Sequence, residues 1–233
     1  MKETVLLIPG LLCDRSLWRH QLEYMGRDYV LKVADLSIGN SIEEFAENAM
    51  ALVPDGAFNI AGLSMGGYVA LEIYKHAPER VSRLALLNAS PYADLAEHAQ
   101  YRRSSMELAK EHGLGDVVDS LLGRLIHPSR YQEEELVKTI DAMAHRVGVD
   151  GFIRQQTALL NRQDYTSTLR TVSCPSLILV GQQDALTPPK ISREMAQQIP
   201  ASKLVEIESC AHLSTLEQPE AVTALLRYWL QDE

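Results

Sequence analysis

The sequence predicts an α/β fold: a doubly wound, mostly parallel six-stranded sheet with an inserted helical cap. Three observations lead to this prediction. Short apolar segments alternate with helical segments along most of the chain. Those apolar segments are continuous runs such as VLLI, LALL and SLILV, which are typical of parallel strands covered on both faces. One stretch in the middle of the chain has helical spacing alone, which indicates helices inserted into the alternation.

The strands are expected, in chain order, at residues 4–8, 29–36, 58–63, 81–87, 173–180 and 203–208. The first is a β-branched and apolar run that ends at Pro9-Gly10. Helices are expected at residues 41–52, 66–76, 189–198 and 219–230. Ser41 begins the first of these helices with a capping box, because Glu44 lies three residues further on. Pro78 ends the second helix.

Between Pro91 and about Leu169 the pattern changes. Apolar residues there are spaced as on the buried face of a helix. They form two groups: Val117, Val118, Leu121, Leu122, Leu125 and Ile126, then Leu136, Val137, Ile140, Met143, Ala144 and Val147. We therefore expect three to four amphipathic helices and no strand in this stretch.

Composition narrows the classes of function. The 233 residues carry a formal net charge of −9, which opposes a nucleic-acid partner or an anionic membrane, because phosphate binding needs a basic face. No apolar run approaches the roughly 18–20 residues of a membrane span. The apolar start is expected to be a buried strand rather than a secretory signal, because Pro9-Gly10 breaks the run. Three cysteines are too few for a disulfide framework and suit a cytoplasmic protein: Cys13, Cys174 and Cys210.

A G-x-S-x-G motif lies between an expected strand and an expected helix: Gly62-Leu63-Ser64-Met65-Gly66. In this context the serine sits on a sharp turn that exposes its hydroxyl above the end of the sheet. The turn strains the serine backbone and leaves little room for side chains two residues to either side. Ser64 is therefore the candidate nucleophile.

A serine nucleophile needs a general base, and in sites of this type the acid and then the histidine follow it in the chain. Of the seven histidines, His20 precedes Ser64, His76 ends the expected helix that Ser64 begins, and four lie in the helical stretch. Only His212 follows the last expected strand, in a loop at the same edge of the sheet as Ser64. His212 is therefore the candidate base.

The acid that orients this imidazole should lie just after the fifth expected strand. Asp184 lies there and is the only carboxylate of that loop. Asp164 precedes the strand, whereas Glu206 and Glu208 lie within the last one. Asp184 is therefore the candidate acid.

The tetrahedral intermediate of acyl transfer needs two backbone donors. The N–H of Met65, directly after the nucleophile, is one of them. The second should come from the loop after the first strand, where Gly10 allows a close turn and Leu11 supplies the N–H. A plain strand-ending turn is the alternative interpretation of that loop.

Four segments of the chain resemble a compact α/β-hydrolase: Leu-Leu-Ile-Pro-Gly-Leu, Gly-Leu-Ser-Met-Gly-Gly-Tyr, Leu-Val-Gly-Gln-Gln-Asp-Ala-Leu-Thr-Pro-Pro and Cys-Ala-His-Leu-Ser-Thr-Leu-Glu-Gln-Pro-Glu. They are spread from residue 5 to residue 220. The resemblance implies the same roles for the same residues: Ser64 as nucleophile, Asp184 as acid, His212 as base, and Leu11 and Met65 as oxyanion donors. It also implies that the helices at residues 92–168 roof the site.

Two features depart from the family pattern. Pro9-Gly10 stands where the family often has His-Gly, and the chain begins directly on what resembles the family's third strand. A leading antiparallel hairpin is therefore expected to be missing, which leaves about six parallel strands. Because positions 64, 184 and 212 lie on both sides of the helical stretch, we expect residues 1–233 to form one domain with residues 92–168 inserted as a lid.

The sequence thus predicts a cofactor-free serine hydrolase that cleaves a small or medium carboxylic ester through an acyl-enzyme. The lid leucines and Phe152 suggest an acyl pocket of moderate apolarity. No histidine or carboxylate cluster has metal-ligand spacing, so no metal is expected.

Several alternatives stay open at this point. The same triad can run perhydrolysis, thioester hydrolysis, acyl transfer or C–C bond hydrolysis, because fold does not decide chemistry. A non-catalytic ligand receptor on the same scaffold is disfavoured by the intact triad. A doubly wound nucleotide-binding protein is disfavoured because the loop after the first strand lacks G-x-G-x-x-G. The natural substrate and the oligomeric state do not follow from the sequence.

Overall fold

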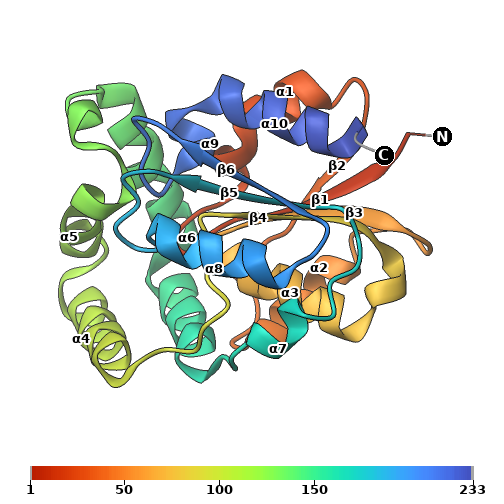
Figure 1. The fold of residues 1–233 in the computed structure, drawn as a ribbon. Coiled ribbons are helices and arrows are strands. Elements are labelled where there is room, and N and C mark those ends of the chain that lie inside the picture. The colour runs from red at the N-terminus through yellow and green to blue at the C-terminus, as the bar shows by residue number, and fades with distance from the viewer. Residues whose placement is uncertain (1, 232–233) are drawn as a thin grey trace.

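The computed structural model of the protein describes residues 2–231 and contains one sheet of six parallel strands (Figure 1). Their order across the sheet is β2-β1-β3-β4-β5-β6. The strands are β1 (Thr4–Ile8), β2 (Val30–Val33), β3 (Phe58–Leu63), β4 (Val81–Leu87), β5 (Ser176–Gly181) and β6 (Ser202–Ile207). Because every pair is parallel, the loops after all six strands emerge at one edge of the sheet.

Helices cover both faces of the sheet (Figure 1). One face carries α1 (Arg19–Met25) and α10 (Pro219–Gln231), and the other carries α2 (Ile42–Met50), α3 (Met65–His76) and α8 (Pro189–Gln198). Side chains of β1 alternate between the two layers, since Val5 and Leu7 belong to one apolar core while Leu6 and Ile8 belong to the other. Both faces of the strand are buried, which explains its continuous apolar sequence.

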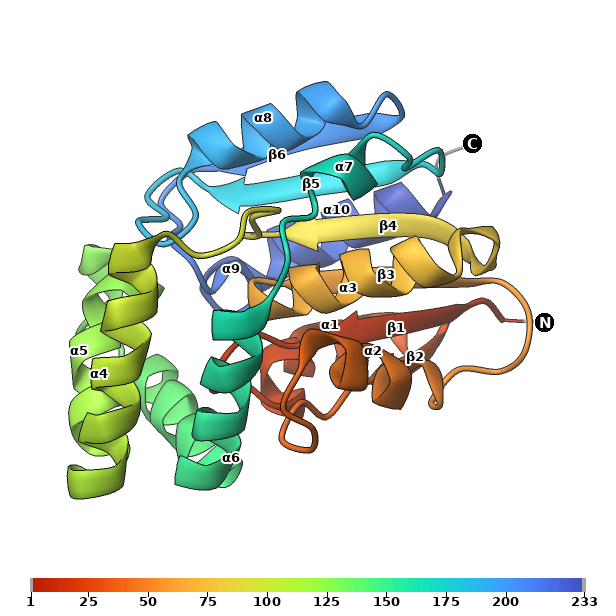
Figure 2. The same ribbon diagram turned by 90° about the horizontal axis from the view of Figure 1, so that it is seen from below.

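The chain between β4 and β5 is helical in the structure and contains no strand. Its helices are α4 (Ala96–His112), α5 (Gly115–Leu125), α6 (Glu134–Asn161) and α7 (Thr166–Leu169). Gly148 interrupts α6 with a left-handed φ of 72°, which kinks the helix. Figure 2 shows α4, α5 and α6 gathered beyond the carboxyl ends of the strands, where the strand-end loops lie.

A buried charge network anchors both ends of this helical segment. Arg162, just after α6, pairs with Asp94, just before α4, at 2.7 Å, and only 4% of either side chain is exposed. Arg102 of α4 also pairs with Asp94, at 2.6 Å. Because a buried charge without its partner is costly, this network holds the two ends of the segment together.

Short elements complete the chain: the 3₁₀ turns η1 (Arg15–Trp18), η2 (Pro78–Arg80) and η3 (Pro128–Arg130), and the single-turn helix α9 (Ser214–Glu217). Helix α1 was not among the expected elements. Its buried face includes Gln21, which donates to Thr223 of α10 at 3.1 Å, so the apolar spacing that marks a helix in sequence is broken there.

Strand β5 begins at Ser176 rather than at residue 173, and two further differences from the sequence expectations have a hydrogen-bonding cause. Strand β2 ends at Val33 rather than Leu36, because the Asp35 carboxylate accepts the N–H of Ser37 at 2.9 Å and begins a turn. At the start of α2, Ser41 accepts the N–H of Glu44 as expected, but the Glu44 carboxylate accepts from Asn40 instead of closing the capping box on Ser41.

Candidate active site

Ser64 sits on a strained turn between β3 and α3. Its backbone dihedral angles are φ 55° and ψ −115°, a combination that costs a non-glycine residue on the order of 1–3 kcal/mol. Hydrogen bonds hold the turn in place, because the Ser64 N–H donates to the carbonyl of Leu87 at 2.9 Å and the Ser64 carbonyl accepts from Gly67. The serine side chain therefore projects from the carboxyl edge of the sheet, as the motif predicts.

Glycines let the backbone pack against this turn. A Cβ atom on Gly62 would lie 2.2 Å from the carbonyl oxygen of Gly66. One on Gly66 would lie 2.2 Å from the carbonyl oxygen of Ile8. The loop after β1 also approaches closely, since a Cβ on Gly10 would lie 3.3 Å from the Cβ of Ser64. The two motif glycines are thus required for space, and the nucleophile turn and the loop after β1 form one packed unit.

The structure brings Ser64, His212 and Asp184 into one hydrogen-bonded chain. Ser64 Oγ lies 2.8 Å from His212 Nε2, and His212 Nδ1 lies 2.8 Å from Asp184 Oδ2. An ionised carboxylate can only accept, so Nδ1 carries the proton that it donates to Asp184. In the neutral ring Nε2 is then the acceptor for the Ser64 hydroxyl, which is the arrangement that a general base needs.

Asp184 is held as a buried anion. Burial alone would raise the pKa of its carboxyl, but the charge of His212 and hydrogen bonds from His212, Asn88 and Thr187 outweigh that effect and lower the pKa below its ordinary value. Its Oδ1 accepts the N–H groups of Leu186 and Thr187 at 2.8 and 2.9 Å. Asp184 thus stays ionised when His212 becomes protonated.

Asn88 supports this acid and was not predicted from the sequence. It follows β4 directly, with a left-handed φ of 46°. Its Nδ2 donates to Asp184 Oδ2 at 2.9 Å and to the carbonyl of Ala211 at 3.0 Å, while its Oδ1 accepts from Ser214 Oγ at 2.6 Å. The available signal was a polar residue directly after a buried strand, at the edge of the sheet where Ser64 lies.

Glu217, in α9, holds the loop before His212. Its carboxylate accepts the N–H of Ala211 at 2.8 Å and the N–H of His127, which precedes η3, at 2.6 Å. Burial raises the pKa of this carboxyl, and the two N–H donors and the charge of Arg130 only partly offset the rise. Glu217 therefore joins the histidine loop to the segment between β4 and β5.

The end of α5 contacts the same loop. The carbonyl oxygen of Leu125 accepts the N–H of His212 at 3.1 Å and that of Leu213 at 2.9 Å. On its other side the loop packs on β5, because a Cβ on Gly181 would lie 2.2 Å from the carbonyl oxygen of Ala211. The backbone of His212 is thus fixed from both sides.

Leu11 and Met65 supply free backbone donors beside Ser64. Met65 is the first residue of α3, so its N–H has no partner within the helix. Within residues 2–231, neither its N–H nor that of Leu11 donates to a protein acceptor. Leu11 directly follows Gly10, which packs on Ser64. Two N–H groups, one directly after Ser64 and one directly after Gly10, are therefore left without a protein acceptor.

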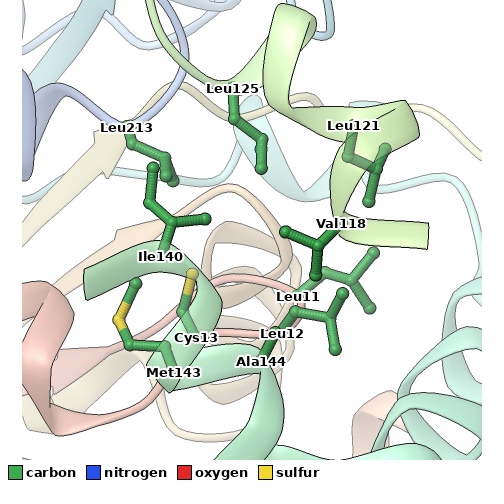
Figure 3. A pocket seen from close by; sticks show the side chains of 10 residues that line it. All are labelled: Leu11, Leu12, Cys13, Val118, Leu121, Leu125, Ile140, Met143, Ala144 and Leu213. Atoms are coloured by element: carbon green, nitrogen blue, oxygen red, sulfur yellow. The ribbon is translucent and has the colours of Figure 1, made fainter. Parts of the chain in front are cut away.

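An apolar pocket includes Leu11 and Leu213, the residue after His212, in its lining (Figure 3). About 250 Å³ in and around this pocket is not filled by protein atoms, open solvent included. Its lining is Leu11, Leu12, Cys13, Val118, Leu121, Leu125, Ile140, Met143, Ala144 and Leu213. The side chains come from α5, α6 and the loops that carry Leu11 and His212. Phe152, expected near an acyl pocket, is buried in the core and does not line this one.

The buried thiols do not take part in this arrangement. Burial raises the pKa of Cys13 to about 12 and raises that of Cys210 as well, which keeps both protonated. In the part of the chain that the structure describes, no group of three or more histidine, cysteine, aspartate or glutamate side chains is placed to hold a metal ion. Over the same residues, no helix has both the length and the apolarity needed to cross a bilayer.

Comparison with known proteins decides the family. The model of the α/β hydrolase fold matches residues 28–219, most of the chain. The chain belongs to the α/β-hydrolase family. A thermophilic esterase from Thermogutta terrifontis, solved with malate bound, is 30% identical to this hydrolase, with a TM-score of 0.91 over 99% of this chain and 90% of its own. The enol-lactonase from Burkholderia xenovorans has the same fold at 21% identity, with a TM-score of 0.90 over 100% of this chain and 92% of its own.

Curated relatives of this α/β-hydrolase include two that match nearly its whole length. A pimeloyl-[acyl-carrier protein] methyl ester esterase of Neisseria meningitidis is 27% identical over 97% of this chain and 93% of its own length. A 3-oxoadipate enol-lactonase of Acinetobacter baylyi is 26% identical over 94% of this chain and 85% of its own length. The predictions of the family, of the doubly wound parallel sheet and of an enzyme of the hydrolase class are confirmed.

Replacing Gly66 with alanine tests the packing of the nucleophile turn. The new Cβ would lie 2.2 Å from the carbonyl oxygen of Ile8, so the turn and the loop after β1 must separate. We expect Gly66→Ala to lower the free energy of unfolding by about 1–3 kcal/mol or more, measured by urea denaturation. Gly115→Ala is the matched control, because nothing lies within 4 Å of its Cβ position and alanine favours the helix. Equal stability of the two variants would contradict the packing argument.

Asp184 makes stability depend on pH. Its pKa lies below the ordinary 3.8, so between those two values the unfolded chain binds a proton that the native chain does not. The stabilisation that the ionised Asp184 carboxyl gives the native state is therefore complete above its ordinary pKa. It is lost as the pH falls through the lowered pKa of the native state. We expect the unfolding free energy of the wild type to fall more steeply with acidification below about pH 4 than that of Asp184→Asn, by up to about 1.4 kcal/mol per pH unit. Parallel curves for the two proteins would refute this.

Proposed function

We propose that this α/β-hydrolase is a serine esterase in which Ser64 is the nucleophile, His212 the general base and Asp184 the acid that orients it. The observation that carries the proposal is the hydrogen-bonded chain from Asp184 through His212 to Ser64, with 2.8 Å at each link. The strained conformation of the nucleophile turn supports it, because such strain persists where function requires an exposed side chain. The N–H groups of Leu11 and Met65 form the oxyanion hole.

Acylation begins when Ser64 Oγ attacks the acyl carbon and His212 Nε2 takes the hydroxyl proton. The oxyanion of the tetrahedral intermediate accepts hydrogen bonds from Leu11 and Met65. When the intermediate collapses, the bond to the alkoxy oxygen breaks and the imidazolium gives its proton to the departing alcohol. Water then attacks the acyl-enzyme with His212 as base again, and the carboxylic acid leaves as Ser64 Oγ recovers its proton.

The substrate follows from the pocket beside the site. Its ten lining residues are apolar, so it suits an aliphatic acyl group rather than a charged one. The proposed substrate class is therefore a small-molecule ester with an apolar acyl group.

Residues 92–168 form the lid in this proposal. Two lid helices, α5 and α6, contribute Val118, Leu121, Ile140 and other side chains to the pocket lining. The Asp94 network joins the two ends of the lid to each other. The bonds from Leu125 to the histidine loop and from His127 to Glu217 of α9 attach the lid to the rest of the domain. The lid thus determines which acyl group reaches Ser64.

The same triad can catalyse other reactions, each with a different class of substrate. Perhydrolysis, thioester hydrolysis, acyl transfer and C–C bond hydrolysis all begin with the same nucleophile. Ester hydrolysis is favoured here because the esterase relatives include the 30% identical Thermogutta protein. A substrate panel separates these reactions by their rates. To the oxygen esters it adds hydrogen peroxide for perhydrolysis, a thioester for thioester hydrolysis, a second alcohol for acyl transfer and a vinylogous ketone for C–C bond hydrolysis.

Ser64→Ala tests the nucleophile. We expect the wild type to react with a fluorophosphonate probe and to hydrolyse p-nitrophenyl butyrate, and the variant to lose kcat by on the order of 10⁴-fold or more and to resist labelling. Ser37→Ala is the control, because Ser37 lies after β2 and makes no contact with His212. Equal turnover by Ser64→Ala, or an unlabelled wild type, would refute the serine esterase.

Leu121→Trp tests the acyl pocket. The larger ring fills space that an acyl chain would occupy, so kcat/KM for the p-nitrophenyl hexanoate ester should fall by about 10-fold or more, while that for the acetate ester changes little. Leu108→Trp serves as the control in α4, since Leu108 does not line the pocket. A uniform loss across all chain lengths would contradict the placement of the acyl group.

A further inference from the structure

We propose that Gln155 is a positioning residue of the oxyanion hole, which acts from α6 through the backbone of the loop after β1. The inference rests on the proposed function and extends it to a residue of the helical segment. The Gln155 side chain hydrogen-bonds Leu12 and Leu36 and neither Ser64 nor His212, so its effect passes through the backbone that carries Leu11.

The Gln155 amide bridges two loops at the carboxyl edge of the sheet. Its Oε1 accepts the N–H of Leu12 at 2.9 Å, and its Nε2 donates to the carbonyl of Leu36 at 3.1 Å. The two partners determine the orientation of the amide, because an N–H needs the oxygen and a carbonyl needs the NH₂ group. The side chain is fully buried, so neither hydrogen bond can be replaced by one to bulk water.

The loop that receives this hydrogen bond is a strained turn. The Cys13 N–H donates to the carbonyl of Gly10 at 3.2 Å and closes a four-residue turn. Leu12, the third residue of the turn, has a φ of 56°, in the left-handed region that a non-glycine side chain rarely adopts. Positive φ at this position corresponds to one orientation of the central peptide, and rotation of that peptide by half a turn would bring φ to an unstrained negative value.

Gln155 opposes that rotation. The central peptide joins Leu11 to Leu12, and its N–H points at Gln155 Oε1. After rotation the Leu11 carbonyl would face the Gln155 oxygen, and the Leu12 N–H would lose its buried acceptor. Gln155 thereby keeps the Leu12 N–H occupied and fixes ψ of Leu11, the residue whose own N–H, in the preceding peptide, is the proposed oxyanion donor.

Gln155→Met tests this role against Gln156→Met as a matched control. Gln156 is also buried, but its Oε1 accepts from Arg102 at 2.8 Å and not from the turn. We expect Gln155→Met to lower kcat for p-nitrophenyl butyrate by about 10- to 100-fold, less than the loss of a donor itself. KM should stay within about twofold of the wild type, because the effect concerns the transition state.

A trifluoromethyl ketone provides a second readout, since its adduct with the serine carries an oxyanion. Its inhibition constant should rise in Gln155→Met by about the factor by which kcat/KM falls. Gln156→Met should keep kcat and the inhibition constant near their wild-type values, even where its melting temperature is lower. If the role of Gln155 were purely structural, Gln155→Met and Gln156→Met would not differ in kcat or in the inhibition constant.

Gln155→Glu keeps the test informative where the methionine variant does not fold. The carboxylate can accept from Leu12 but cannot donate to Leu36, whereas the protonated carboxyl can do both. We therefore expect kcat/KM of Gln155→Glu, divided by kcat/KM of the wild type at the same pH, to rise as the pH falls.

Three results would overturn the inference while the wild type remains active. They are an unchanged kcat and inhibition constant in Gln155→Met, equal losses in Gln155→Met and Gln156→Met, and a ratio for Gln155→Glu that does not vary with pH. An absence of ester turnover by the wild type would instead overturn the proposed function and this inference with it.

Discussion

The close packing of backbone around Ser64 is the constraint on which the rest of the site depends. A serine in the conformation φ 55°, ψ −115° relaxes unless its surroundings prevent it. Here Gly66 lies directly against the carbonyl of Ile8, Gly62 against that of Gly66, and the Ser64 N–H is held by Leu87 of β4. These contacts join β1, β3, β4 and α3 at one point. The same contacts set the loop of Leu11 beside Ser64, so one packing arrangement positions both the proposed nucleophile and a proposed donor for the oxyanion.

The parallel sheet brings the remaining groups to this point. Loops after β4, β5 and β6 emerge at the edge where Ser64 lies, and they carry Asn88, Asp184 and His212. Asn88 contacts both the acid and the loop of the base, which couples the three strand ends. The helical segment then adds its own hydrogen bonds, through Leu125 to the histidine loop and through Gln155 to the turn of Leu12. Segments far apart in the chain thus hold both the histidine loop and the turn of Leu12 in the proposed site.

Much of this arrangement could be predicted from the sequence, because it depends on local signals. Buried parallel strands are continuous apolar runs, and Ser64, Asp184 and His212 each lie where a strand has just ended. Gln155 could not be predicted, since its role depends on a partner 143 residues away, and Asn88 was missed because its partner Asp184 is 96 residues away. A polar residue in an amphipathic helix has the same appearance in sequence whether it faces solvent or a buried turn.

The most direct test of the account is to find the residue that carries the acyl group. Rapid acid quench of the enzyme with p-nitrophenyl acetate traps the intermediate, and fragmentation of the tryptic peptide of residues 33–75 locates the added acetyl group by mass spectrometry. A serine nucleophile predicts an acetyl group on Ser64, formed at the rate of the p-nitrophenol burst. An acetyl group on another residue, or turnover without any covalent intermediate, would contradict it.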